Sequence, residues 1–199
     1  MMTEETILKK DRAKIIVSTS QKLFAKNGLS NTTMEDIATK ADMGTASIYY
    51  YFKSKEEIFE AVIEKEGKSL QTTIIAAVSI ATGPQEKIKT FFTTRMAEIK
   101  KLSNYYRVLH DEYKQNFAIV ERARLTYDVF EITLLSNILQ EGVDIHQFVV
   151  TDVTLTAETI IASLKGLEEK WSRNLSIEDI KYNINLLLNI LFKGIEIRI

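Results

Sequence analysis

The side chains that could act together chemically are hydroxyl and aromatic groups near the N-terminus. Residues 45–52 read Thr-Ala-Ser-Ile-Tyr-Tyr-Tyr-Phe and follow another short segment of helical character at residues 33–41. Hydroxyl groups hydrogen-bond to base edges or phosphates, and the DNA major groove admits one helix, which reads it through its N-terminal residues. Two short helices joined by a tight turn meet that demand. Residues 33–52 therefore predict a helix-turn-helix unit that binds DNA.

Three helices must position these groups. Apolar residues at helical spacing predict a first helix over residues 11–27, which Gly28 ends in a left-handed conformation. Thr33 and Asp36 form a capping box at the start of the second helix. A third helix fits residues 45–51. Asp42 lies in the turn before it, and aspartate tolerates a left-handed backbone better than most residues other than glycine.

The rest of the chain is also predicted to be helical, because it contains only one proline and few glycines. A fourth helix begins after Ser54 and ends near residue 81, before Pro84 starts the next one. A further capping box at Ser176 and Asp179 starts the last helix. The later helices are predicted over residues 84–102, 104–118, 120–142, 151–171 and 176–197. The expected fold is all-α, with an N-terminal three-helix unit, a larger C-terminal helical bundle and about nine helices.

Composition excludes several classes of protein. The chain has no cysteine, which removes disulfides, thiolate zinc sites and cysteine nucleophiles. His110 and His146 lie beside no recognisable nucleophile or metal-ligand set, so we expect no catalytic residue, no metal and no cofactor. The charged N-terminus and the lack of a long apolar run predict neither a secretory signal nor a membrane span, and favour the cytoplasm.

The charges are unevenly distributed along the chain. The net charge is −1, but residues 1–55 carry nine Lys and Arg against six Asp and Glu, and the remaining residues carry 17 against 21. A general positive field that coats nucleic acid is therefore excluded, and any nucleic-acid surface should lie on the first segment.

Two stretches carry a resemblance to a known family. Residues 33–38 read Thr-Met-Glu-Asp-Ile-Ala, and residues 44–59 read Gly-Thr-Ala-Ser-Ile-Tyr-Tyr-Tyr-Phe-Lys-Ser-Lys-Glu-Glu-Ile-Phe. They resemble the TetR family of bacterial regulators over about a quarter of the chain, roughly residues 15–63. The resemblance implies a DNA-binding domain, here residues 1–54, and a ligand-binding and dimerisation domain, here residues 55–199. It also implies dimerisation through the last two helices and repression relieved by a small molecule.

Position by position, the resemblance implies which residues contact DNA. Hydroxyl groups suit bases or phosphates, the Ala46 methyl group can meet a thymine methyl group, and Lys55 can neutralise a phosphate. Two alternatives stay open: Thr33 serves only as a helix cap, and the tyrosines serve only in packing. The implied contacts are Thr33, Thr45, Ala46, Ser47, Tyr49, Tyr50 and Lys55.

The chain departs from the family pattern at several places. Asp42 stands where a glycine is usual, and Glu35 puts an acid where some relatives have a cation that contacts DNA. No arginine lies between Arg12 and Arg95, so the third helix cannot make the bidentate contact of arginine with guanine. We therefore expect A·T contacts and groove shape to carry specificity.

A ligand site in a helical domain should lie between helices, where apolar walls carry a few polar groups. The densest stretch of polar and aromatic residues is 105–113, and four side chains at helical spacing could share one face there, namely Tyr106, His110, Tyr113 and Phe117. The further candidates are Phe91, Arg95, Tyr127 and Asn137. The alternative is that the aromatic residues are core and that the histidine and arginine are solvated or paired.

The last two predicted helices carry wide apolar stripes. We expect them to pair with their symmetry mates in a homodimer, although both could instead be buried within one subunit. The sequence thus favours a homodimeric repressor that a small, mainly apolar ligand releases from a double-stranded DNA operator. The alternatives are a bundle that binds a protein or only dimerises, and a ligand-dependent activator.

Overall fold

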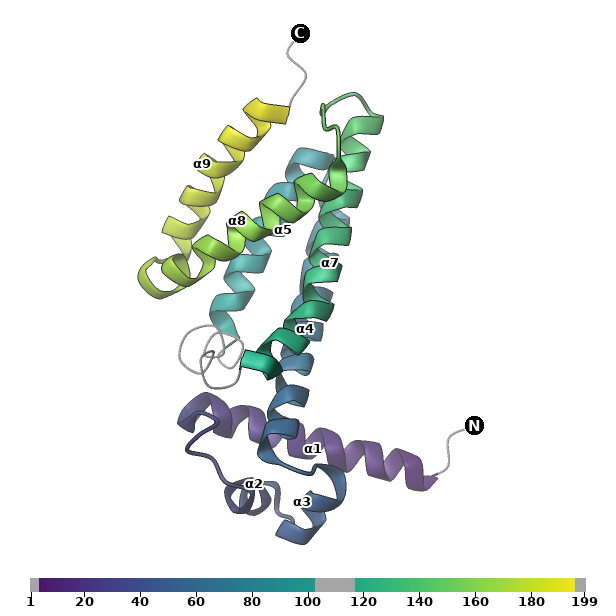
Figure 1. Ribbon diagram of the computed structural model, residues 1–199, viewed down its shortest axis with the longest axis vertical. Helices are drawn as coiled ribbons and strands as arrows, with labels where there is room; N and C mark the ends of the chain where they lie inside the picture. The colour runs from purple at the N-terminus through teal and green to yellow at the C-terminus, as the bar shows by residue number, and fades with distance from the viewer. Residues whose placement is uncertain (1–3, 103–116, 196–199) are drawn as a thin grey trace. The chain divides into compact units, whose positions relative to one another are not determined.

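The computed structural model describes residues 4–102 and 117–195, and these residues form eight helices (Figure 1). The helices are α1 (Glu4–Asn27), α2 (Met34–Ala41), α3 (Thr45–Tyr51), α4 (Lys55–Ile80), α5 (Pro84–Lys101), α7 (Phe117–Asp144), α8 (Val153–Asn174) and α9 (Ile177–Ile195). The all-α prediction is confirmed. Most of the helix predicted over 104–118 lies outside the described residues. Helix α1 begins earlier than predicted, because residues 4–10 contain no proline or glycine that would stop it.

By contacts the chain forms two compact units. Of the described residues, the N-terminal unit comprises 4–67 and 117–123, and the C-terminal unit comprises 68–102 and 124–195. This division falls within α4, whereas the sequence analysis placed the domain boundary before that helix, after residue 54. The domain assignment stays a prediction.

The N-terminal unit has a core to which each of its first four helices contributes. Ile16, Ile37, Ile48 and Ile58 are fully buried, one from each of α1 to α4. Ile48 is the only buried residue of α3. One side chain therefore anchors α3 in the core, and the rest of that short helix is left available to a partner.

Two left-handed residues end the helices that frame α3. Gly28 follows α1 with φ 81°, and Asp42 follows α2 with φ 53° and ψ 48°. The amides of Asp42 and Met43 donate to the carbonyl oxygens of Thr39 and Ala38, at 3.3 and 3.0 Å, which is a Schellman motif. The predicted left-handed conformations at Gly28 and Asp42 are both confirmed.

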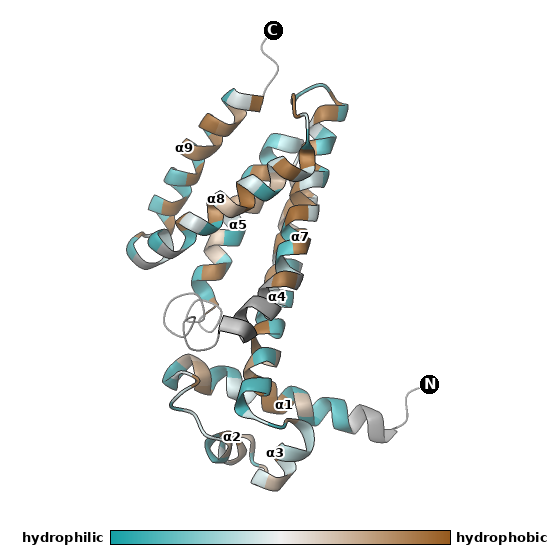
Figure 2. Cartoon of the chain, in the orientation of Figure 1, coloured by the Kyte–Doolittle hydropathy of each residue, from teal (hydrophilic) through white to brown (hydrophobic). Residues whose placement is uncertain are grey.

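The C-terminal unit is built from the end of α4 and helices α5, α7, α8 and α9. Helix α5 starts with Pro84, as predicted, after Gly83 at φ 76°. The core is apolar and draws on every one of these helices, with Ile74, Phe91, Leu139, Leu164 and Ile184 all buried. Figure 2 shows hydrophobic and hydrophilic residues alternating along α8 and α9. Within the described part of the chain, no helix is long and apolar enough to cross a membrane.

Candidate nucleic-acid interface and buried polar cluster

Helix α3 directs most of its side chains to solvent. Tyr49 is 51% exposed and Tyr50 is 64% exposed, while Ala46 and Ser47 are also exposed and Thr45 is half-buried. The five residues of α3 that are predicted to contact DNA are therefore accessible to a partner, whereas Ile48 is buried in the core. Two large aromatic side chains at the surface of so short a helix do not contribute to the core of this unit.

The Tyr50 ring has two neighbours. Its centroid lies 5.1 Å from that of Tyr51, edge to face, and the Lys9 ammonium group lies 4.6 Å from its centroid. This cation–π contact joins α1 to α3. Sequence reasoning missed Lys9, because the contact joins residues far apart in the sequence.

Thr33 is the N-cap of α2 and makes the complete capping box that its spacing predicts. Its hydroxyl and backbone amide donate to the Asp36 carboxylate at 2.7 and 2.9 Å, and its hydroxyl accepts from the Asp36 amide at 3.1 Å. These bonds hold the pKa of Asp36 below its usual value. A phosphate at Thr33 would have to displace the Asp36 carboxylate, so the structure favours the capping role that the sequence left open.

Lys55 begins α4 and uses its ammonium group within the protein. It donates to the carbonyl oxygens of Leu29, Ser30 and Thr32, at 2.9, 3.2 and 3.0 Å. An ammonium group has three donors, so these bonds account for all of them. The phosphate contact implied for Lys55 stays a prediction, but the structure gives this residue a positioning role that the sequence did not reveal.

A buried ion cluster lies inside the C-terminal unit. Arg95 on α5 is 1% exposed; its Nε pairs with Glu131 on α7, and its guanidinium lies 2.9 Å from the Glu168 carboxylate on α8. Both glutamates are fully buried, as are the neighbouring candidates Phe91 and Tyr127. The cluster joins three helices. Of the predicted ligand residues, the structure thus buries Arg95, Phe91 and Tyr127 within this unit.

The cluster has more negative than positive charge. Burial by itself would lower the pKa of Arg95, but the charges of Glu131 and Glu168 raise it well above its usual value. Burial raises the pKa of the Glu131 carboxyl group, although the Arg95 charge opposes this. Within the described residues, the two buried carboxylates share the single guanidinium of Arg95.

The remaining ligand candidates are distributed differently. Asn137 is exposed on α7, so the structure does not bring it to the buried cluster. Tyr106, His110 and Tyr113 lie outside the described residues. Phe117 is the first residue of α7, and its side chain is likewise not among those described. These four residues therefore stay predictions from the sequence.

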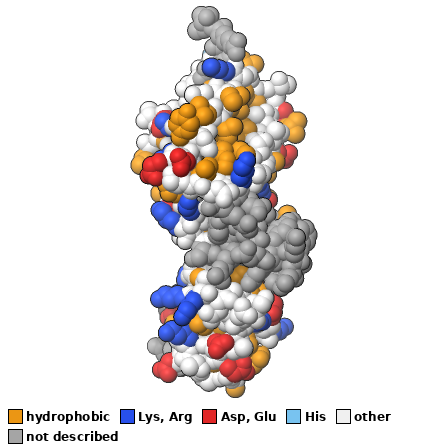
Figure 3. Space-filling model, turned by 90° about the vertical axis from the view of Figure 1, so that its left-hand side faces the viewer, with side chains coloured by type: hydrophobic (Ala, Val, Ile, Leu, Met, Phe, Trp, Pro, Cys, Tyr) orange, Lys and Arg blue, Asp and Glu red, His pale blue; other side chains and the backbone are white. Residues whose placement is uncertain are grey.

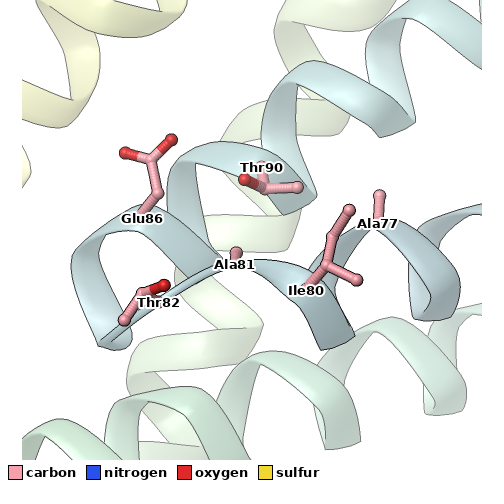
Figure 4. Close-up of a pocket in the computed structure, with 6 residues that line it drawn as sticks. All are labelled: Ala77, Ile80, Ala81, Thr82, Glu86 and Thr90. Atoms are coloured by element: carbon pink, nitrogen blue, oxygen red, sulfur yellow. The ribbon is translucent and has the colours of Figure 1, made fainter.

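Described residues of the C-terminal unit line two hollows. One, of about 280 Å³, lies among α5, α8 and α9 and is lined mainly by leucine and isoleucine. Figure 3 views the side on which α8 and α9 lie in Figure 1 and shows hydrophobic side chains gathered there. The other, of about 350 Å³, follows the connection from α4 to α5 (Figure 4). Its short side chains do not converge on one point, and Glu86 is its only charged group, so it lacks the features of an effector site.

Comparison with known proteins finds a family match in the N-terminal part of the chain and a relative that is similar over a longer stretch. The family model for bacterial regulatory proteins of the tetR family matches residues 16–62. The HTH-type transcriptional repressor KstR2 of Mycolicibacterium smegmatis is 32% identical over 126 residues, which are 61% of this chain and 60% of that repressor. The match therefore spans less than two thirds of that relative's length.

Two further proteins are similar over nearly the full chain. The fatty acid metabolism regulator protein of Bacillus subtilis is 24% identical over 195 residues, which cover 91% of this chain and 94% of that protein. The solved structure of a transcriptional regulator from Cytophaga hutchinsonii has a TM-score of 0.75 and 27% identity, and covers 92% of this chain and 98% of its own. The described helices thus form a fold that known regulators share.

Proposed function

We propose that this chain, which belongs to the TetR family of bacterial regulatory proteins, is a homodimeric repressor that releases its operator when a small, mainly apolar molecule occupies its C-terminal unit. The family consists of DNA-binding transcriptional regulators, and its members are not enzymes. The finer parts of the proposal, namely the dimer, the effector and the contact residues, each rest on a separate observation. Binding to chromosomal DNA would place the protein in the cytoplasm.

The exposure of α3 is the observation that carries the proposal. Ile48 fixes the helix in the core, while Tyr49 and Tyr50 stand in solvent beside the hydroxyl of Ser47. A helix held in this way can enter a major groove and present hydroxyl and aromatic groups to base edges and phosphates. The lack of an arginine on α3 agrees with recognition through A·T contacts and groove shape.

The dimer is supported by the apolar surface of α8 and α9. Leu155, Leu186 and Ile190 are 59%, 46% and 71% exposed, and Ile190 also lines the apolar hollow among α5, α8 and α9. Pairing of these two helices with those of a second copy would bury this surface in an isologous four-helix interface. A dimer also presents two reading helices to successive major grooves, about 34 Å apart.

The effector site is proposed around the buried Arg95 cluster. Apolar residues such as Phe91 surround a few polar groups, which is the usual composition of a ligand site. The Bacillus subtilis relative is named for fatty acid metabolism, which makes apolar acyl compounds the first class to test. Because Arg95 is already paired with two carboxylates, an anionic ligand would have to compete with Glu131 and Glu168 for it.

The DNA claim is tested by selecting duplexes from a random pool with the purified protein. We expect a palindromic sequence to be enriched and Tyr49→Ala to weaken its binding by about 5-fold to 100-fold, as for the loss of one good base contact. Ile75→Ala on α4 is a control of equal exposure, at 51%, and should bind like the wild type. If no duplex is enriched, the proposal fails.

The effector claim is tested with the enriched duplex and a series of saturated fatty acids. An effector must lower the affinity for DNA, and DNA must lower the affinity for that effector by the same factor. Native mass spectrometry of the purified protein reports the dimer and any molecule that copurifies with it. If no copurifying or added small molecule changes DNA affinity, the bundle serves dimerisation or a protein partner instead.

A further inference from the structure

A row of residues on α1 runs along α3. Lys9, Arg12 and Ile15 are three residues apart and so lie on one side of α1. Lys9 contacts the ring of Tyr50, while Arg12 and Ile15 share a hollow with Ser47. The first half of α1 therefore borders the exposed face of α3.

The hollow between these helices is about 390 Å³ and contains an unpaired cation. Arg12 lines it and is exposed, and no described acid forms an ion pair with it. The Ser47 hydroxyl lines the same hollow and has no hydrogen-bond partner among the described residues. Gly44 forms part of the wall without a side chain, which keeps the space open.

We propose that a phosphate of the DNA backbone occupies this hollow, where the guanidinium of Arg12 and the hydroxyl of Ser47 hold it. The proposal rests on the proposed DNA-binding function and adds α1 to the interface. The sugar-phosphate strands border the major groove, so a duplex with α3 in its groove carries phosphates past the sides of that helix. Arginine binds phosphate through two parallel hydrogen bonds.

Asp42 gives the proposal a second, opposite consequence. Asp42 also lines the hollow, and its negative charge would repel a phosphate bound there. The residue adopts a left-handed backbone with φ 53°, which asparagine tolerates equally well. Asp42→Asn therefore removes the charge without straining the turn. A phosphate in the hollow predicts that the loss of Arg12 weakens DNA binding and that the loss of the Asp42 charge strengthens it.

The experiment measures affinity for the enriched duplex and for a random duplex, in a series of salt concentrations. Arg12→Gln should weaken binding to both duplexes by about 5-fold to 20-fold and lower the slope of log K against log salt by about one for each subunit. Asp42→Asn should strengthen binding to both duplexes by about 2-fold to 5-fold. Thermal unfolding followed by circular dichroism checks that each variant is folded.

Lys22→Gln is the matched control. Lys22 is an exposed cation on α1, about 15 Å along the helix from Arg12, so its removal changes the net charge equally but away from the hollow. Its effect should stay below about 2-fold. The inference is overturned if Arg12→Gln binds like the wild type or like Lys22→Gln, or if Asp42→Asn fails to strengthen binding. A loss confined to the enriched duplex also overturns it, because that indicates a base contact. If the wild type enriches no duplex, the proposed function fails first.

Discussion

The ammonium group of Lys55, the first residue of α4, lies 2.9 Å from the carbonyl oxygen of Leu29, just beyond the end of α1. It binds the carbonyl oxygens of Ser30 and Thr32 as well. These carbonyl groups follow the end of a helix, where backbone acceptors lack intrahelical partners. Lys55 thus ties the α1–α2 connection to the start of α4, and this connection leads directly into the helix-turn-helix.

We predict that Lys55→Met lowers the free energy of unfolding by about 1–3 kcal/mol, because three carbonyl oxygens lose a charged donor. Urea denaturation measures this. Lys53→Met is the control, since the Lys53 side chain is exposed, and it should change the value by less than about 0.5 kcal/mol. If Lys55→Met keeps full stability but loses DNA affinity, Lys55 acts on DNA rather than on the loop.

The Arg95 cluster predicts a larger effect in the C-terminal unit. Arg95→Met would leave Glu131 and Glu168 buried without a counter-charge, and we expect a loss of about 3–5 kcal/mol in the free energy of unfolding. Lys89→Met on the same helix is the control, because Lys89 is partly exposed and lies 4.0 Å from Glu86. Chemical denaturation of both variants makes the comparison. Equal small losses would show that the cluster contributes little to stability.

The sequence could predict interactions between residues that are close together along the chain. The capping boxes at Thr33 and Ser176 and the left-handed stop at Gly28 depend on residues within a few positions, and all three were predicted correctly. Arg95 was identified as a polar group in an apolar stripe, but its partner Glu131 is 36 residues away along the chain. Nothing in the local pattern marks such a pair.

The same limit applies at the candidate DNA interface. The sequence predicted the exposed residues of α3, because helical spacing separates them from Ile48. It could not show that Lys55 is bound to carbonyl groups 23 to 26 residues earlier, or that Lys9 lies over Tyr50. Those contacts depend on how the helices cross, which residue spacing does not specify.

Glu131 predicts a pH dependence of stability. Burial raises the pKa of its carboxyl group above the usual 4.5, so as the pH rises the unfolded chain loses this proton before the folded chain does. The contribution to stability is complete below 4.5 and falls as the pH rises through the folded pKa. Glu131→Gln cannot titrate but keeps an acceptor for Arg95.

We therefore expect wild type to lose stability relative to Glu131→Gln as the pH rises above 4.5. Urea denaturation of both proteins at several pH values measures the difference. Parallel curves over this range would mean that Glu131 titrates at the same pH in the folded and unfolded states.

Gly142 near the end of α7 lies directly against the ring of Phe148. A Cβ atom at position 142 would overlap that ring, which is buried and stacks on Phe192 with centroids 6.1 Å apart. The Gly142 carbonyl oxygen also accepts from the amides of Gln147 and Phe148, at 2.8 and 3.0 Å. These hydrogen bonds hold the backbone of Gly142 and Phe148 in place. The Phe148 ring therefore cannot move away from position 142 without losing its contact with Phe192.

We predict that Gly142→Ala lowers the free energy of unfolding by about 1–3 kcal/mol, as expected for overpacking, despite the higher helix propensity of alanine. Gly67→Ala in the middle of α4 is the matched control: no atom lies within 4 Å of the added Cβ, so it should raise stability by about 0.5–1 kcal/mol. Thermal and urea unfolding of the two variants gives opposite signs if the ring contact decides the outcome. If both alanine variants are more stable than the wild type, the Phe148 ring must have room to move. The segment after α7 is then held by the hydrogen bonds to the Gly142 carbonyl oxygen and not by the packing of the ring.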